Sequence, residues 1–166
     1  MATIEEMLRG SNRRLHWLWL SLLVIVLDQL TKLWASSDLI YGKPVALLPS
    51  LNFTLMHNTG AAFSFLNEAG GWQRWFFALI ALVVSTVLVL WLHRLTSSQR
   101  WLAVALALVL GGALGNLIDR LYLGYVIDFV DVYYDRWHWP AFNVADSSIF
   151  IGVAMLIIDS LRGEKP

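Results

Sequence analysis

Four long apolar stretches divide the chain, and each is long enough to cross a lipid bilayer as a helix. A bilayer core requires about 20 mostly apolar residues per helix. The stretches cover about residues 16–35, 72–92, 101–121 and 143–161. This pattern predicts an all-α, polytopic membrane protein with four transmembrane helices, organised as a single membrane domain over residues 1–166.

The first apolar stretch has an alternative interpretation, because Arg13 and Arg14 followed by an apolar run are also typical of a secretory signal peptide. The apolar region of a signal peptide is shorter, however, and this run contains Asp28 and Lys32. Three further spans follow it. We therefore expect a retained transmembrane helix.

Two of the connecting segments, 36–71 and 122–142, are patterned rather than simple linkers. Apolar residues alternate at Leu51, Phe53 and Leu55, ahead of the turn-forming sequence Asn-Thr-Gly at 58–60, which predicts short strands. Residues 124–139 are β-branched and aromatic with interspersed acids, as in segments that lie at the level of the lipid headgroups. We expect these segments to form a small β-containing platform at one membrane surface.

The composition supports a membrane protein. Hydrophobic residues make up 58% of the chain and charged residues 14%, whereas a soluble domain carries about 25% charged residues. Basic and acidic residues number 12 each, so the net charge gives no reason to expect nucleic acid as a partner. The chain has no cysteine, which excludes disulfides, thiolate metal sites and a cysteine nucleophile.

The positions of the basic residues predict the orientation, because short cytoplasmic segments are enriched in Lys and Arg. Basic residues precede the first span, separate the second from the third, and follow the fourth: Arg9, Arg13, Arg14, Arg94, Arg100, Arg162 and Lys165. The other two connections contain only Lys43, Arg136 and, at the edge of the second span, Arg74. We expect both termini in the cytoplasm and the platform on the outer, periplasmic side.

Ionisable residues within the spans then gather at the outer membrane surface, with the exception of Asp159 near the inner interface. Asp28 and Lys32 lie near the outer end of the first span, and Asp119 and Arg120 end the third. Such groups are costly inside a membrane and usually mark function. A channel or transporter subunit would place them through the depth of the bundle, so their clustering favours one site at the outer surface. The Asp28–Lys32 pair, four residues apart, either neutralises itself or holds the first span against this site.

The third span ends in GGALGNLIDR, which places Gly112, Gly115, Asn116 and Asp119 on one helical face. A seam of small residues that allows another helix to approach closely accounts for the glycines. It accounts less well for Asn116 and Asp119, because polar groups at this depth need a partner or a function.

Two acids suggest a shared chemistry. Asp146 follows Asn143 by three residues, which is close to a capping box and gives Asp146 a purely structural explanation. Asp128 lies among apolar residues, where a lone carboxylate is costly unless it is partnered or functional. Two neighbouring carboxylates share one proton, so one can activate water while the other polarises a carbonyl group. Because a helix N-terminus stabilises negative charge, we expect Asp146 to be the ionised member.

Other chemistries have less support. The four histidines show no zinc-ligand spacing, and we expect neither a metal nor a cofactor. Ser147 or Ser148 with Lys32 would form a serine–lysine dyad, which nothing in their spacing favours. A structural subunit whose carboxylates only cap and pair is the remaining alternative. It predicts that Asp128→Asn changes stability more than turnover.

Five short blocks occur in order along the chain: DQLTK at 28–32, NTGAAFS at 58–64, GGALGNLIDR at 111–120, VIDF at 126–129 and FNVAD at 142–146. Together they resemble bacterial lipoprotein signal peptidase, also called signal peptidase II. The match extends from the first span to the fourth. The resemblance implies an inner-membrane aspartyl peptidase. Such an enzyme cleaves the signal peptide from diacylglyceryl-modified prolipoproteins on the N-terminal side of the lipidated cysteine, and the family is the target of the cyclic peptide globomycin.

The resemblance also implies roles for individual residues. It places the catalytic dyad on Asp128 and Asp146, and so selects Asp128 over Asp131 and Asp135, a choice that spacing does not make. The positions that hold substrate or support the dyad are Asn58, Asn116, Arg120 and Asn143, with Asp119 as the expected partner of Arg120. From their positions in the spans, the residues expected to be structural or supporting are Asp28, Lys32 and Gly112. The expected partners are diacylated prolipoproteins, membrane lipids and globomycin-like inhibitors, and no nucleic acid.

Overall fold

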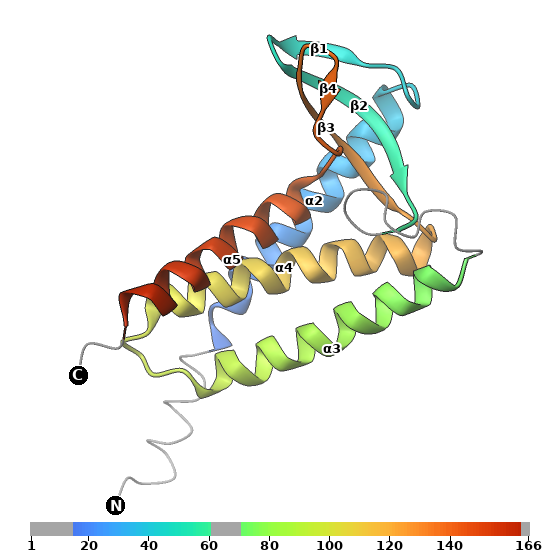
Figure 1. The fold of residues 1–166 in the computed structure, drawn as a ribbon. Coiled ribbons are helices and arrows are strands. Elements are labelled where there is room, and N and C mark those ends of the chain that lie inside the picture. Colours follow the sequence, from blue (N-terminus) through green and yellow to red (C-terminus); the bar gives the residue numbers. More distant parts are fainter. Residues whose placement is uncertain (1–14, 61–70, 164–166) are drawn as a thin grey trace, which may run out of the picture.

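The computed structural model describes residues 15–60 and 71–163, which form four long helices and a small antiparallel sheet (Figure 1). The helices are α2 (Leu18–Asp38), α3 (Trp72–Arg94), α4 (Arg100–Tyr122) and α5 (Val144–Arg162). Each is long and apolar enough to cross a membrane, so the four predicted spans are confirmed to within a few residues and the chain is a multi-pass membrane protein. The basic residues Arg9, Arg13, Arg14 and Lys165 and positions 61–70 of the predicted platform lie outside the described residues.

Helix α4 forms the centre of the bundle and packs against α2, α3 and α5. In its most apolar stretch 61% of the residues are buried, against 28%, 22% and 17% in α2, α3 and α5. The other three helices therefore turn apolar side chains such as Leu22, Leu79 and Phe150 outward. Lipid is the environment that suits these faces.

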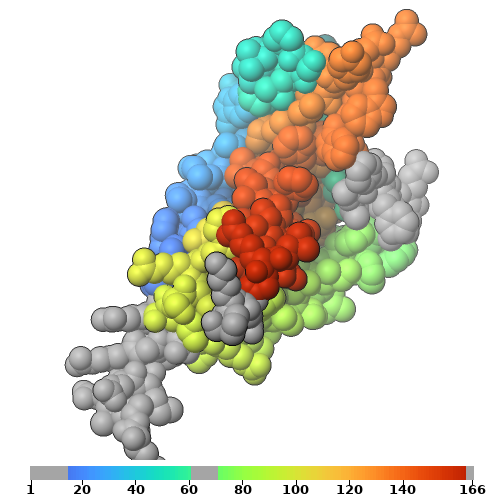
Figure 2. Space-filling model, turned by 60° about the vertical axis from the view of Figure 1, so that its left-hand side comes forward, coloured from blue at the N-terminus to red at the C-terminus, as the bar shows by residue number. Residues whose placement is uncertain are grey.

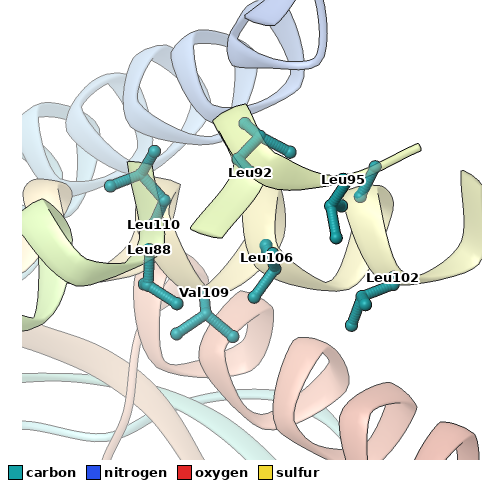
Figure 3. Packing of buried hydrophobic residues seen from close by; sticks show 8 residues of the cluster. Leu88, Leu92, Leu95, Leu102, Leu106, Val109 and Leu110 are labelled. Atoms are coloured by element: carbon teal, nitrogen blue, oxygen red, sulfur yellow. The ribbon is translucent and has the colours of Figure 1, made fainter. Parts of the chain in front are cut away.

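The contact between α3 and α4 is a tight cluster of branched aliphatic side chains (Figure 3). Its members include Leu88, Leu92, Leu102, Leu106 and Leu110, and Leu106 is fully buried. Lipid tails are as apolar as leucine, so the gain from this cluster comes from van der Waals packing rather than from release of water.

Glycines bring α5 close to α4. A Cβ atom at Gly112 would lie 2.3 Å from the carbonyl oxygen of Ala145, and one at Gly152 would lie 2.7 Å from that of Ala105. Real Cβ atoms do not approach this closely, so both positions require glycine unless the helices separate. This close approach presses the first turn of α5 onto the polar end of α4.

The sheet lies at one end of the bundle and confirms the predicted strands, while their place on the outer side of the membrane stays a prediction (Figure 1). Its strands are β1 (Val45–Leu48), β2 (Leu51–Asn58), β3 (Val126–Tyr134) and β4 (Trp137–His138), paired in this order. Strand β3 follows α4 after a short turn and pairs antiparallel with β2, so that Met56 lies opposite Asp128. A bridge between Val130 and Phe142 then leads the chain into α5. The sheet thus connects the C-terminal end of α4 to the N-terminal end of α5.

Candidate active site

Asp128 and Asp146 reach the same place from two different elements. Asp128 is the third residue of β3, and Asp146 lies in the first turn of α5. Two asparagines connect them. Asn143 Nδ2 donates to Asp128 Oδ1 at 2.7 Å and to Asn116 Oδ1 at 3.2 Å, while Asn116 Nδ2 donates to Asp146 Oδ1 at 2.7 Å. The two carboxylates are therefore held by one continuous hydrogen-bond network.

The capping box anticipated at the start of α5 is present, and it uses only part of Asp146. The backbone N–H of Asp146 donates to Asn143 Oδ1 at 2.9 Å, and Asp146 Oδ2 accepts from the backbone N–H of Asn143 at 3.3 Å. Asp146 Oδ1 bonds Asn116 instead. Capping explains one carboxylate oxygen and leaves the other at the site.

Asp128 is held from both sides and almost fully buried. Asn58 Nδ2 donates to Asp128 Oδ2 at 3.1 Å, opposite the bond from Asn143. Burial, together with the negative charge of Asp146, raises the pKa of Asp128 to about 7, and the two asparagine bonds only partly oppose this rise. Asp128 therefore retains a proton in much of the neutral range, as expected of a dyad that shares one proton.

Lys32 binds the residues that support the dyad from α2 and α4. Its ammonium lies 2.8 Å from Asp28 and 2.9 Å from Asp119, and it donates to Asn116 Oδ1 at 2.9 Å. Since an ammonium only donates, this contact fixes the amide of Asn116 with its oxygen toward Lys32 and its nitrogen toward Asp146. Asp28 Oδ1 also accepts from the backbone N–H of Ala145 at 2.9 Å and so ties α2 to the first turn of α5.

The expected pairing of Asp119 with Arg120 is wrong. Asp119 bonds Lys32, Gln29 at 2.8 Å and the backbone N–H of Ile127 at 3.1 Å. Arg120 donates to the carbonyls of Asn116 and Gly60 at 3.2 and 3.1 Å. Consecutive helical residues point about 100° apart, so the two side chains diverge, and Lys32 supplies the cation instead.

Gln29 is a polar site neighbour that the sequence reasoning missed. Besides Asp119, it donates to the carbonyl of Gly115 at 3.3 Å. Its one signal in the sequence is an amide within an apolar span, next to Asp28.

The structure does not bring together a serine–lysine dyad. The hydroxyls of Ser147 and Ser148 donate to the carbonyls of Asn143 and Ala145 at 2.9 and 2.8 Å. Lys32 is bonded to two acids and an amide. Among residues 15–60 and 71–163, no group of three or more His, Asp or Glu side chains is arranged to hold a metal ion.

A pocket of about 680 Å³ opens beside Asp146. This volume lies within the range of about 300–1,000 Å³ that is usual for ligand sites. Asp128 is buried next to it. The polar lining comes from Asn58, Asn116, Arg120, Asp146 and Ser147, and the apolar lining includes Trp139, Pro140, Phe142, Ile149, Phe150 and Val153. A ligand with one polar and one apolar part fits such a pocket lining.

Comparison with known proteins gives consistent results. The model of the Signal peptidase (SPase) II family, Peptidase_A8, matches residues 20–162. The lipoprotein signal peptidase of Pseudomonas aeruginosa (strain UCBPP-PA14) is 56% identical over 154 residues, which are 92% of this chain and 91% of the relative. That of Acinetobacter baumannii (strain AB307-0294) is 59% identical over 151 residues, 91% and 86% of the two chains. A solved bacterial membrane enzyme superimposes with a TM-score of 0.80 at 33% identity, covering 91% of this chain and 93% of that one.

Proposed function

This chain belongs to the signal peptidase II family of membrane peptidases, and we propose that it removes the signal peptide from diacylglyceryl-modified prolipoproteins, cutting on the N-terminal side of the lipidated cysteine. We propose Asp128 and Asp146 as the catalytic dyad. The observation that carries this assignment is the asparagine network that joins the two carboxylates, with Asp146 lining the pocket and Asp128 buried next to it.

In the proposed reaction, a water molecule attacks the carbonyl carbon of the scissile bond. Ionised Asp146 takes a proton from this water while protonated Asp128 donates its proton to the carbonyl oxygen, which gives a neutral diol. The C–N bond then breaks as Asp146 passes its proton to the leaving amine. A hydroxyl proton of the diol returns to Asp128, so both acids regain their starting states.

Asn58 and Arg120 are proposed to hold the substrate backbone, since both line the pocket. Two bonds from the five N–H groups of Arg120 go to backbone carbonyls, and its Nε is buried without a partner among the described residues. Donors therefore remain for peptide carbonyls. The apolar wall of α5 suits a substrate that arrives sideways from the bilayer with its acyl chains in lipid, and a globomycin-like cyclic peptide would compete for the same space.

We propose a location in the bacterial inner membrane, with the termini in the cytoplasm and the sheet on the periplasmic side. The described basic residues support this orientation. Arg94 ends α3, Arg100 begins α4 and Arg162 ends α5, all at the end of the bundle away from the sheet (Figure 1). Cytoplasmic ends of short loops carry this enrichment.

The function is tested with purified protein in detergent and two forms of one precursor, with and without the diacylglyceryl group. We expect cleavage of the modified form only, because the apolar pocket wall of α5 holds the acyl chains. The bond that is cut should be the peptide bond on the N-terminal side of the lipidated cysteine. Mass spectrometry of the products identifies the bond. Equal cleavage of both forms would contradict the proposed substrate class, and cleavage of neither would contradict the proposed function.

A pH profile tests the role of Asp128. Because the reaction needs Asp128 protonated, kcat/KM should fall as the pH rises through about 7, the pKa to which burial raises this acid, with a slope of about tenfold per pH unit. The hydrogen bond from Asn58 lowers the pKa of Asp128, so Asn58→Ala should move this falling limb to higher pH. If the falling limb of kcat/KM stays at the same pH in Asn58→Ala, the titrating acid is not Asp128.

A further inference from the structure

A second polar cluster lies on the sheet, apart from the dyad, and consists of Asp131, His138, Asn52 and Thr54. Asp131 Oδ1 lies 2.7 Å from His138 Nδ1, and its Oδ2 accepts from Thr54 Oγ1 at 3.0 Å and Asn52 Nδ2 at 3.2 Å. One buried carboxylate thus joins β2, β3 and β4. We call the Asp131–His138 contact the hairpin clasp.

The protonation of the clasp follows from its partners. Burial alone would raise the pKa of Asp131, but the bonds from His138, Asn52 and Thr54 outweigh burial and lower it. Asp131 is therefore ionised and only accepts hydrogen bonds. His138 must carry its proton on Nδ1 and donate it to Asp131.

The clasp belongs to a weakly paired hairpin, at the end away from its turn. Strand β4 has two residues, and it pairs with β3 through Tyr133–His138 and Tyr134–Trp137. So short a hairpin is marginal on its own. In Figure 2 the segment, in orange, projects at the upper end of the molecule. A side-chain contact between the half-exposed His138 and the buried Asp131 is therefore important for its position.

The clasp is connected to the pocket by the chain that follows it. The backbone N–H of Trp139 donates to the carbonyl of Val132 at 2.8 Å, and the Val130–Phe142 bridge fixes the far end of this stretch. Trp139, Phe142 and the two residues between them line the pocket. This stretch, residues 139–142, forms one wall of the pocket, and the clasp lies at the N-terminal end of the stretch.

We propose that Asp131 and His138 are positioning residues that hold the 139–142 wall against the substrate and so set its affinity. This inference rests on the proposed function, because it assigns the pocket to the peptide substrate. Neither residue lines the pocket, and the dyad has its own supports in Asn58, Asn116 and Asn143. Loosening the wall should therefore change KM and leave kcat nearly unchanged.

The experiment compares His138→Ala with His138→Asn on the diacylated precursor. Asn places an N–H donor near the position of Nδ1, whereas Ala removes it. We expect His138→Ala to raise KM about three- to tenfold with kcat within about twofold, because a half-exposed bond to a charged acceptor is lost. His138→Asn should restore most of the affinity.

The matched control is Asp135→Asn, in the turn of the same hairpin. Asp135 has a φ of 54°, a conformation that Asn adopts readily, and we expect wild-type KM. Unchanged KM in His138→Ala beside an active wild type would overturn the clasp alone. A lower kcat at constant KM would indicate only loss of folded enzyme and would also overturn it. An inactive wild type would refute the proposed function and, with it, this inference.

Discussion

Asp128→Asn is expected to abolish cleavage while the fold survives, with turnover reduced by about 10²–10⁴. The amide keeps the shape of the carboxyl group but cannot donate an acidic proton to the scissile carbonyl. Asp146→Asn should have an effect of similar size, because an amide cannot accept the proton of water. Both variants are measured on the diacylated precursor at matched amounts of folded protein.

Stability separates this prediction from the purely structural alternative. The pKa of Asp128 is raised to about 7 in the folded protein, above its value in an unfolded chain. Ionising Asp128 therefore destabilises the fold as the pH rises from about 4 to about 7. Asp128→Asn removes this penalty, so its melting temperature relative to wild type should be higher at pH 8 than at pH 5.

The structural alternative makes the opposite prediction, namely that Asp128→Asn loses stability and keeps turnover. Two controls complete the comparison. Asp135→Asn, just beyond β3, and Asp159→Asn, in the same helix as Asp146, each remove a carboxylate outside the site. Both should cleave at the wild-type rate. Loss of turnover in these controls would mean that overall charge, rather than the dyad, is being measured.

The four spans were predictable because the length of an apolar run is a property of the sequence alone. Which residues of β2 are buried was harder to predict from the sequence. The alternation at Leu51, Phe53 and Leu55 predicts one apolar face, and the strand does form. However, the register shifts between Phe53 and Met56, and the buried positions include Asn52 and Thr54. These two bond Asp131, which the sequence does not place.

The partners within the site depend on how the helices are rotated about their axes, which no local pattern fixes. Asp119 and Arg120 are neighbours in the chain, and their pairing was a reasonable expectation. Packing of α2 against α4 instead places Lys32 beside Asp119. Similarly, the sequence identifies Asn143 as a helix cap, but it does not reveal that the amide nitrogen of the same side chain binds Asp128.

Lys32→Met should cause the largest loss of stability, because it removes one cation from between two buried acids. Lys32, Asp28 and Asp119 are all almost completely inaccessible. Breaking a buried ion pair by removing one partner typically destabilises a protein by about 3–5 kcal/mol, since the remaining charge is left uncompensated. Turnover should fall as well, since Asn116 loses the contact that orients its amide toward Asp146. Unfolding in detergent measures the stability change, with the exposed Lys43→Met as control.

A compensating variant identifies the cause of this loss. When Asp28→Asn and Asp119→Asn accompany Lys32→Met, no charge is left in the cluster, and replacing a buried ionic group by neutral residues is often tolerated. We therefore expect the triple variant to recover most of the stability but not the activity, because Asn116 remains unanchored. If the triple variant is as unstable as Lys32→Met, the loss reflects packing around residue 32. If the triple variant instead recovers both stability and full turnover, the contact from Lys32 to Asn116 has no part in orienting Asp146.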